Sequence, residues 1–315
     1  MVHKKHHYIP QCYLRGFSHK APKNIFHLFI YDRIIRQSLY PNIDDIFSQN
    51  YLYKPRPSAK NYIRTTSNDI DNIFEVDFFA TFIEPWYKHD IDLLNEHINN
   101  GTIFPLNKKF DFSCLMAIQL LRLPLQKVYF AKRFEKLVEL FKYQIVTNEL
   151  HFDPKLICSD DSFIHFLSGY GNMELIETLA KFFFSGKWEF YIDQKGRFYT
   201  SDCPIVLMPS VCELHTNKLY ISKDIRSISF PVTKEILLNI DVRDLSNKNQ
   251  YKTCSIIKAT EQIVTKFNCQ QFLFCDRQVA SYYNDFSFIE DILNITDINF
   301  ISNKEIISNG TSNNA

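Results

Sequence analysis

Side chains that could bind or transfer protons gather near the start of the chain, in the run HHYIPQCYLR. His6 and His7 carry imidazoles, which act as acids, bases and metal ligands close to neutral pH. Gln11 and Arg15 follow within two helical turns, and the arginine offers a planar fork that holds carboxylate or phosphate groups. These residue types predict either an anion-binding site with an acid–base group or a structural anchor.

The same stretch has an apolar face, which is unusual because chain termini are ordinarily loose and polar. Pro10 suits the first turn of a short helix, where its missing N–H is not needed. From there Tyr13, Leu14 and Phe17 fall on one side at helical spacing. We therefore expect this segment to be ordered and buried.

The adjacent histidines also raise the question of a metal. Neighbouring side chains in a strand or a helix point in different directions, so at most one of His6 and His7 joins a given site. The run HHYIP resembles the opening of the HNH nucleases, but the Asn24–His27 gap that follows is too short for that fold. A catalytic or metal-binding role for one histidine and a packing role for both stay open, and the sequence identifies no metal.

A second group of polar residues lies on an expected helix from Asp111 to Pro124. Gln119 and Arg122 project toward the side that should face inward, together with Leu115 and Ile118. A buried guanidinium needs carboxylate or carbonyl partners. Arg122 is therefore either a structural lock between two layers or a clamp for an anionic ligand.

Carboxylates that could accompany this arginine occur at several places. Glu84 is the better candidate for a buried partner of Arg15 or Arg122, whereas Glu75 and Glu84, nine residues apart on an expected α-helix, face different directions. Asp202 follows an expected strand and precedes a proline-containing turn. Strand ends display reactive side chains, but turn aspartates commonly bond to their own backbone.

We predict that these separate blocks converge into one polar cluster. In the first hypothesis the protein is an enzyme, a hydrolase or nuclease acting on a phosphate-containing substrate. In the second it is a non-catalytic binding or interaction module, in which the same cluster is a structural lock. The expected catalytic residues are His6, His7 and Asp202, and the expected substrate-binding residues are Gln11, Arg15, Gln119 and Arg122.

Four blocks resemble segments of a bacterial family, the domain of unknown function 4238. HHYIPQCYLRGF resembles its HHY-x-PQ-x-YL-x-x-F opening, and IQLLRLP (118–124) resembles its IQ-x-x-R-x-P helix. TSDCPIV (200–206) resembles its SD-x-PV segment, and SFPVTKEILL (229–238) its PLSP-type strand pair, with PVT in place of PLSP. The resemblance covers most of the chain and brings no established activity with it.

Composition limits the remaining possibilities. The 315 residues are 45% hydrophobic and 15% aromatic, which is typical of a globular protein with a sizeable core. The net charge of +1 gives no global attraction for nucleic acid, which stays possible as a partner without being indicated. The eight cysteines form no C-x-x-C pair, and no signal peptide or membrane span is visible. We expect a cytoplasmic protein whose cofactors and partners the sequence does not identify.

Patterning predicts an α+β fold with an N-terminal hairpin, central long helices and a C-terminal sheet rich in antiparallel pairs. The hairpin is expected from 25–31 and 34–39 around Asp32 and Arg33. Helices are expected over 67–99 with a kink or break at Pro85, over 111–149 with an interruption at Pro124, over 173–184 and over 258–268.

Strands are expected over 205–208, 228–232 and 236–240, in a hairpin of 188–192 with 197–201, and over 272–275. No Gly-rich phosphate loop and no G-x-S-x-G elbow occurs. We expect a single domain over 1–302, helical over about 67–186 and strand-rich over about 187–276, and a disordered tail over 303–315.

Overall fold

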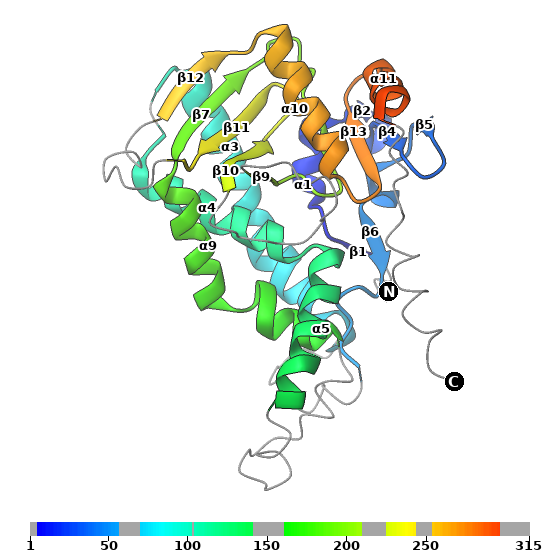
Figure 1. The fold of residues 1–315 in the computed structure, drawn as a ribbon, viewed down its shortest axis with the longest axis vertical. Helices are drawn as coiled ribbons and strands as arrows, with labels where there is room; N and C mark the ends of the chain where they lie inside the picture. Colours follow the sequence, from blue (N-terminus) through cyan, green and yellow to red (C-terminus); the bar gives the residue numbers. More distant parts are fainter. Residues whose placement is uncertain are drawn as a thin grey trace, which may run out of the picture.

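The structure of the protein is a computed structural model that describes residues 5–56, 70–102, 104–140, 161–209, 225–243 and 254–296. The α+β fold predicted from the sequence is confirmed: helices lie below a five-stranded sheet, and a smaller four-stranded sheet stands beside it (Figure 1). The first residues (67–69) of the helix predicted over 67–99, the helical extension over 141–149 and the tail over 303–315 lie outside the described residues.

The larger sheet has the strand order β12-β7-β11-β10-β9. Its neighbouring strands are antiparallel, except that β12 runs parallel to β7. Trp188 and Phe190 pair with Ile240 and Leu238, and all four side chains are buried, which is the period of two expected for a sheet with one face on the core. The strands are β7 (Lys187–Ile192), β9 (Val206–Pro209), β10 (Ile225–Pro231), β11 (Ile236–Asp241) and β12 (Cys254–Lys258).

The smaller sheet has the order β5-β4-β13-β8, and it corrects the predicted hairpin of 188–192 with 197–201. Strand β8 (Thr200–Ser201) pairs with β13 (Gln278–Ser281), so it lies in a different sheet from β7. The reason is the turn before it. The Asp193 carboxylate accepts hydrogen bonds from the backbone N–H of Arg197 at 3.0 Å and from its Nε at 2.9 Å, which closes a loop and redirects the chain.

The N-terminal hairpin is shorter than predicted. Strand β4 (Phe29–Asp32) pairs with β5 (Gln37–Leu39), while β3 (Ile25–His27) pairs with β2 (His19–Ala21) in a separate ribbon. The expected first strand is thus divided at Leu28, whose side chain is fully buried.

The predicted strand over 272–275 is also wrong. Residues 272–274 form the last turn of α10 (Glu261–Phe274), which begins with Thr260 as its cap. Phe272 and Cys275 are fully buried, as expected, and they pack with Val279 in a small apolar cluster. A short buried apolar run does not by itself distinguish a strand from a helix end.

Three long helical regions match the predictions closely. In the first, the chain stays helical through Pro85, where a kink or break was expected: residues 73–83 form a π-helix that passes directly into α3 (Glu84–Asn99), so the helix type changes next to the proline. The second divides at Pro124 into α4 (Leu106–Leu121) and α5 (Pro124–Leu140), and the third is α9 (Met173–Ser185). Helices α4 and α9 lie side by side below the larger sheet (Figure 1).

Short elements complete the described part of the chain. Strand β1 pairs with β6 and brings the N-terminal segment beside residues 48–50. These elements are β1 (Lys5–His7), α1 (Gln11–Leu14), η1 (Arg15–Phe17), η2 (Pro22–Asn24), η3 (Ile43–Asp45), β6 (Ser48–Asn50), η4 (Ile70–Asn72), η5 (the π-helix Ile73–Ile83), α8 (Asp161–His165), η6 (Phe166–Tyr170) and α11 (Ser287–Thr296). Within the described residues, no helix combines the length and apolar character needed to cross a bilayer.

Candidate functional site

The N-terminal segment lies in the core between the helices and the larger sheet. Tyr13, Leu14 and Phe17 are at most 1% exposed, in line with their spacing on one helical face. The Tyr13 hydroxyl lies 2.6 Å from both the Thr200 hydroxyl and the Pro231 carbonyl. This arrangement fixes α1 against both sheets and thereby fixes the positions of the histidines that precede it.

His6 is fully buried and its ring nitrogens are engaged. The backbone N–H of Tyr53 donates to Nδ1 at 3.0 Å, so the ring proton lies on Nε2, which is 3.2 Å from the Asn72 side-chain oxygen. The Tyr53 ring also stacks on the imidazole, with centroids 5.8 Å apart. His6 is thus a neutral histidine held between the N-terminal strand and residues 53 and 72.

His7 faces a different set of partners. Its backbone N–H donates to Glu75 Oε1 at 3.1 Å, and its carbonyl accepts a hydrogen bond from Arg122 Nη2. The imidazole Nε2 lies 3.3 Å from the Gln11 amide nitrogen, which also donates to Asp44 Oδ1 at 3.0 Å. Burial lowers the pKa of His7 below its usual value; the Asp44 carbonyl opposes this effect and the Arg122 charge adds to it.

Arg122 ends α4 and its side chain is fully buried, in line with the inward face predicted for it. Nη2 lies 3.9 Å from Glu84 Oε1, the partner favoured by the sequence, and the guanidinium stands 3.8 Å from the centre of the Phe79 ring. The Tyr53 hydroxyl donates to the Arg122 carbonyl at 2.9 Å. Nη1 is buried and has no hydrogen-bond partner within the described part of the chain.

Two more buried polar atoms near this arginine lack a hydrogen bond. Gln119 donates through Nε2 to the Tyr8 carbonyl at 2.9 Å, while its Oε1 has no partner in the described ranges. The same is true of Glu75 Oε2, whereas Glu75 Oε1 holds the His7 N–H. A buried polar atom without a hydrogen bond lowers the free energy of unfolding by about 1–3 kcal/mol, so these atoms destabilise the fold.

Glu75 is the site residue that our sequence analysis missed. Burial raises the pKa of its carboxyl to about 7, and the Arg122 charge only partly opposes this. The missed signal is helix geometry. Residues 73–83 form a π-helix, whose hydrogen bonds join residues five apart, so nine residues make about two turns instead of two and a half. Glu75 and Glu84 therefore both act electrostatically on Arg122, which an α-helical period does not suggest.

Asp202 borders the cluster, but its carboxylate serves another segment. It accepts backbone N–H groups from Asp276 at 2.8 Å, Arg277 at 2.6 Å and Gln278 at 2.8 Å, which holds the loop between α10 and β13. Burial raises the pKa of Asp202 to about 7, the Asp276 charge adds to this, and the three N–H groups oppose it. Its link to the histidines is Tyr8, whose pKa is raised by burial and then by the Asp202 charge.

The structure thus brings together most, but not all, of the predicted site residues. His7, Gln11, Gln119 and Arg122 touch one another or the backbone of residues 7 and 8. Arg15 lies apart: it is exposed, and its guanidinium stands 5.2 Å from the centre of the Phe26 ring. Among the described residues, no group of three His, Cys, Asp or Glu side chains is placed to hold a metal ion.

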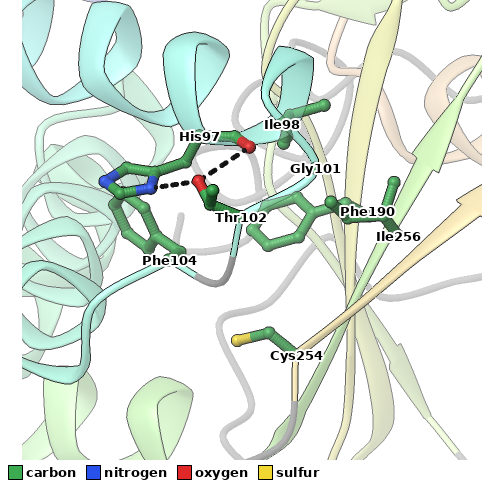
Figure 2. A pocket seen from close by; sticks show the side chains of 8 residues that line it. All are labelled: His97, Ile98, Gly101, Thr102, Phe104, Phe190, Cys254 and Ile256. Carbon is green, nitrogen blue, oxygen red and sulfur yellow. Dashed lines mark hydrogen bonds between the residues drawn. The ribbon is translucent and has the colours of Figure 1, made fainter.

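A cavity elsewhere in the fold has a different character. It lies at the end of α3, between Ile98, Phe104 and Phe190 (Figure 2). Its volume is about 190 Å³. His97 is hydrogen-bonded through Nδ1 to the Thr102 hydroxyl at 2.7 Å, and among the described residues no aspartate, glutamate, lysine or arginine lines this cavity. None of the predicted site residues contributes to it.

Comparison with known proteins gives one match. The model of a family described as "Protein of unknown function (DUF4238)" matches residues 5–285, which include the four sequence blocks and the whole cluster. No curated protein and no solved structure matches the chain.

Proposed function

This chain belongs to the DUF4238 family, whose description names no activity, and we propose that it is a hydrolase of phosphate esters with its acid–base pair at His7 and Glu75. One observation carries the proposal. The His7 N–H donates to Glu75, whose carboxyl has a pKa of about 7, and the His7 carbonyl accepts a hydrogen bond from Arg122, a buried arginine whose Nη1 has no hydrogen-bond partner among the described residues. The His7 imidazole beside them has a lowered pKa. Strongly perturbed groups with a specific charge partner are typical of catalytic sites.

The imidazole has the protonation state that a general base needs. Its lowered pKa keeps it neutral at pH 7. The Asp44 carbonyl can only accept the ring proton, and the Gln11 amide group can donate to Nε2, so Nε2 is the acceptor atom. In the proposed reaction, this atom takes a proton from the attacking water.

Glu75 supplies the complementary acid. About half of its carboxyl groups are protonated near pH 7, because burial disfavours the charged form. The attacking water forms the new P–O bond, the ester P–O bond breaks, and the Glu75 proton goes to the leaving oxygen. Arg122 Nη1 donates to a phosphoryl oxygen and stabilises the negative charge of the transition state.

Hydrolysis of two chromogenic esters tests this assignment. We expect turnover of bis(4-nitrophenyl) phosphate or 4-nitrophenyl phosphate, and a loss of about 100-fold or more in kcat in His7→Ala and in Glu75→Gln. His7→Ala keeps the backbone N–H and carbonyl that hold Glu75 and Arg122, so it removes only the imidazole. His97→Ala, at the cavity of Figure 2, is the matched histidine control and should keep full activity.

The pH dependence of ester hydrolysis is a second test of the roles of His7 and Glu75. Activity should rise as His7 loses its proton below its usual pKa, and should fall above about pH 7 as Glu75 ionises. Glu75→Gln should lose the alkaline limb. Folded His7→Ala and Glu75→Gln proteins that hydrolyse both esters at the wild-type rate would disprove the assignment.

The structural lock is the second candidate, and the contacts of His6, Tyr53 and Arg122 favour it. Tyr53 donates its backbone N–H to His6 and its hydroxyl to the Arg122 carbonyl, which joins β1 to the end of α4. In a non-catalytic module, neither ester is hydrolysed, and His7→Ala affects only stability.

A further inference from the structure

A second cavity is lined by Arg15 and by residues of α1, and His7 does not contribute to it. Its volume is about 240 Å³, and it lies between the N-terminal segment, α3 and the turn between β10 and β11. It is lined by Cys12, Tyr13, Arg15, Gly16, Lys88, Ile91, Asp92, Asn95, Val232 and Thr233.

The apolar part of this cavity is rigid. Tyr13, Ile91 and Val232 are 1%, 7% and 0% exposed, so they belong to the core and keep their positions. The Gly16 carbonyl accepts the Lys234 backbone N–H at 3.2 Å, which ties the N-terminal segment to the turn after β10. The cavity is thus formed by the packing of three elements and not by a single loop.

Charge at the rim is unbalanced in favour of one cation. Lys88 Nζ lies 2.5 Å from Asp92 Oδ2, so these two charges compensate each other. Arg15 packs over Phe26 and forms no ion pair within the described part of the chain. The N–H groups of the Arg15 guanidinium are therefore available to a ligand beside the apolar residues of the cavity.

We propose that this cavity binds a small molecule with an anionic oxygen group, a carboxylate or a phosphate, on a compact apolar body. Arg15 holds the anion, the Asn95 amide provides a neutral hydrogen bond, and the body rests on Ile91 and Val232. At about 30 Å³ per water, the cavity holds the equivalent of about eight waters, which is room for one ring and its anionic group.

The site is distinct from the proposed hydrolytic centre but borders it through Cys12. The Cys12 thiol lines the cavity and contacts the Glu84 carbonyl at 3.7 Å, and Glu84 is the ion-pair partner of Arg122. None of the residues assigned to proton transfer lines the cavity. The inference therefore does not rest on the proposed function.

Three ring compounds of similar size test the proposal with the full-length protein. Benzoate and phenylphosphonate carry the two anions and cannot be hydrolysed by a phosphatase, and benzamide is the neutral match. We expect the two anions to shift the NMR amide signals of Gly16, Asn95 and Thr233, and benzamide to bind at least tenfold more weakly.

Four variants locate the binding. Arg15→Ala should weaken binding of both anions at least tenfold, and Arg15→Lys should lose part of that affinity because it keeps the charge without the fork. Lys181→Ala, which removes an exposed lysine paired with Glu177 on α9, and Arg133→Ala, an exposed arginine on α5, should stay within twofold of wild type. Arg15→Ala must keep the wild-type melting temperature, as expected for an exposed side chain.

Three outcomes would overturn the inference. The first is unchanged binding in Arg15→Ala, and the second is equal binding of benzamide. The third is the absence of any shift with either anion at about 10 mM, a concentration that saturates a millimolar site. Loss of ester hydrolysis in His7→Ala with unchanged benzoate binding would show that the two sites are independent.

Discussion

Replacing Arg122 with alanine should destabilise the protein, whereas replacing an exposed arginine should have little effect on stability. The side chain is fully buried, it donates to the His7 carbonyl, it lies 3.9 Å from Glu84 Oε1, and its guanidinium covers Phe79. Alanine removes all three contacts and opens a cavity. Breaking a buried ion pair by removing one partner costs about 3–5 kcal/mol.

The lower part of that range is the better expectation. Glu84 is 25% exposed, so water can reach its carboxylate once the arginine is gone. With an unfolding entropy of about 2.1 cal/mol/K per residue, the chain of 315 residues loses about 0.66 kcal/mol of stability per degree near its melting temperature. A cost of about 3 kcal/mol then lowers the Tm by about 5 °C.

Thermal and urea unfolding followed by circular dichroism at pH 7 would measure this effect. Arg122→Met fills most of the volume and keeps the contact with Phe79, so it should cost less than alanine. Arg133→Ala on α5, where the arginine is exposed and bonds to the Tyr129 hydroxyl, is the control and should change stability by no more than about 0.5 kcal/mol. A Tm for Arg122→Ala within about 1 °C of wild type would refute the reasoning.

Two further predictions concern the N-terminus and Glu75. Leu14→Ala should cost about 2–5 kcal/mol because Leu14 is fully buried, and deletion of 1–17 should abolish cooperative unfolding in calorimetry; a truncated protein with an unchanged Tm would contradict this. The folded protein binds the Glu75 proton more tightly than the unfolded chain, with a pKa of about 7 against 4.5, so this residue makes stability fall as pH rises from about 4.5 to 7. Glu75→Gln should therefore gain stability relative to wild type at pH 8, by up to about 3 kcal/mol in urea titrations, and an equal pH slope in the two proteins would count against burial of the carboxyl.

The sequence predicted features that depend on regular periodicity. The face formed by Tyr13, Leu14 and Phe17 and the inward position of Arg122 follow from α-helical spacing, and all four side chains are buried. Pro124 separates two helices as expected, because proline lacks the N–H of a helix interior. Hydrophobic pattern and backbone chemistry were sufficient at these positions.

Features that depend on tertiary partners or on unusual backbone geometry were missed. The role of Glu75 depends on a π-helix, and nothing in its neighbouring residue types distinguishes that helix from an α-helix. Strand β8 pairs with β13, which lies almost eighty residues later in the sequence, so no local pattern reveals its sheet. Asp202 is at a strand end, as expected, but three backbone N–H groups from the same distant segment occupy its carboxylate.

The energetics of the cluster separate its two halves. His6, Asn72, Tyr53 and the Arg122 carbonyl satisfy one another, which is sufficient to fix β1 against the end of α4. The other half does not improve stability: Glu75 is buried with a raised pKa, and Glu75, Gln119 and Arg122 each have one buried polar atom without a partner within the described residues. Apolar residues of similar size would pack there at lower cost. If the cluster served only to hold β1 against α4, the buried Glu75 and the unpaired polar atoms would not be needed. The stability that they cost is best explained by the proton transfer and anion binding that we propose for His7, Glu75 and Arg122.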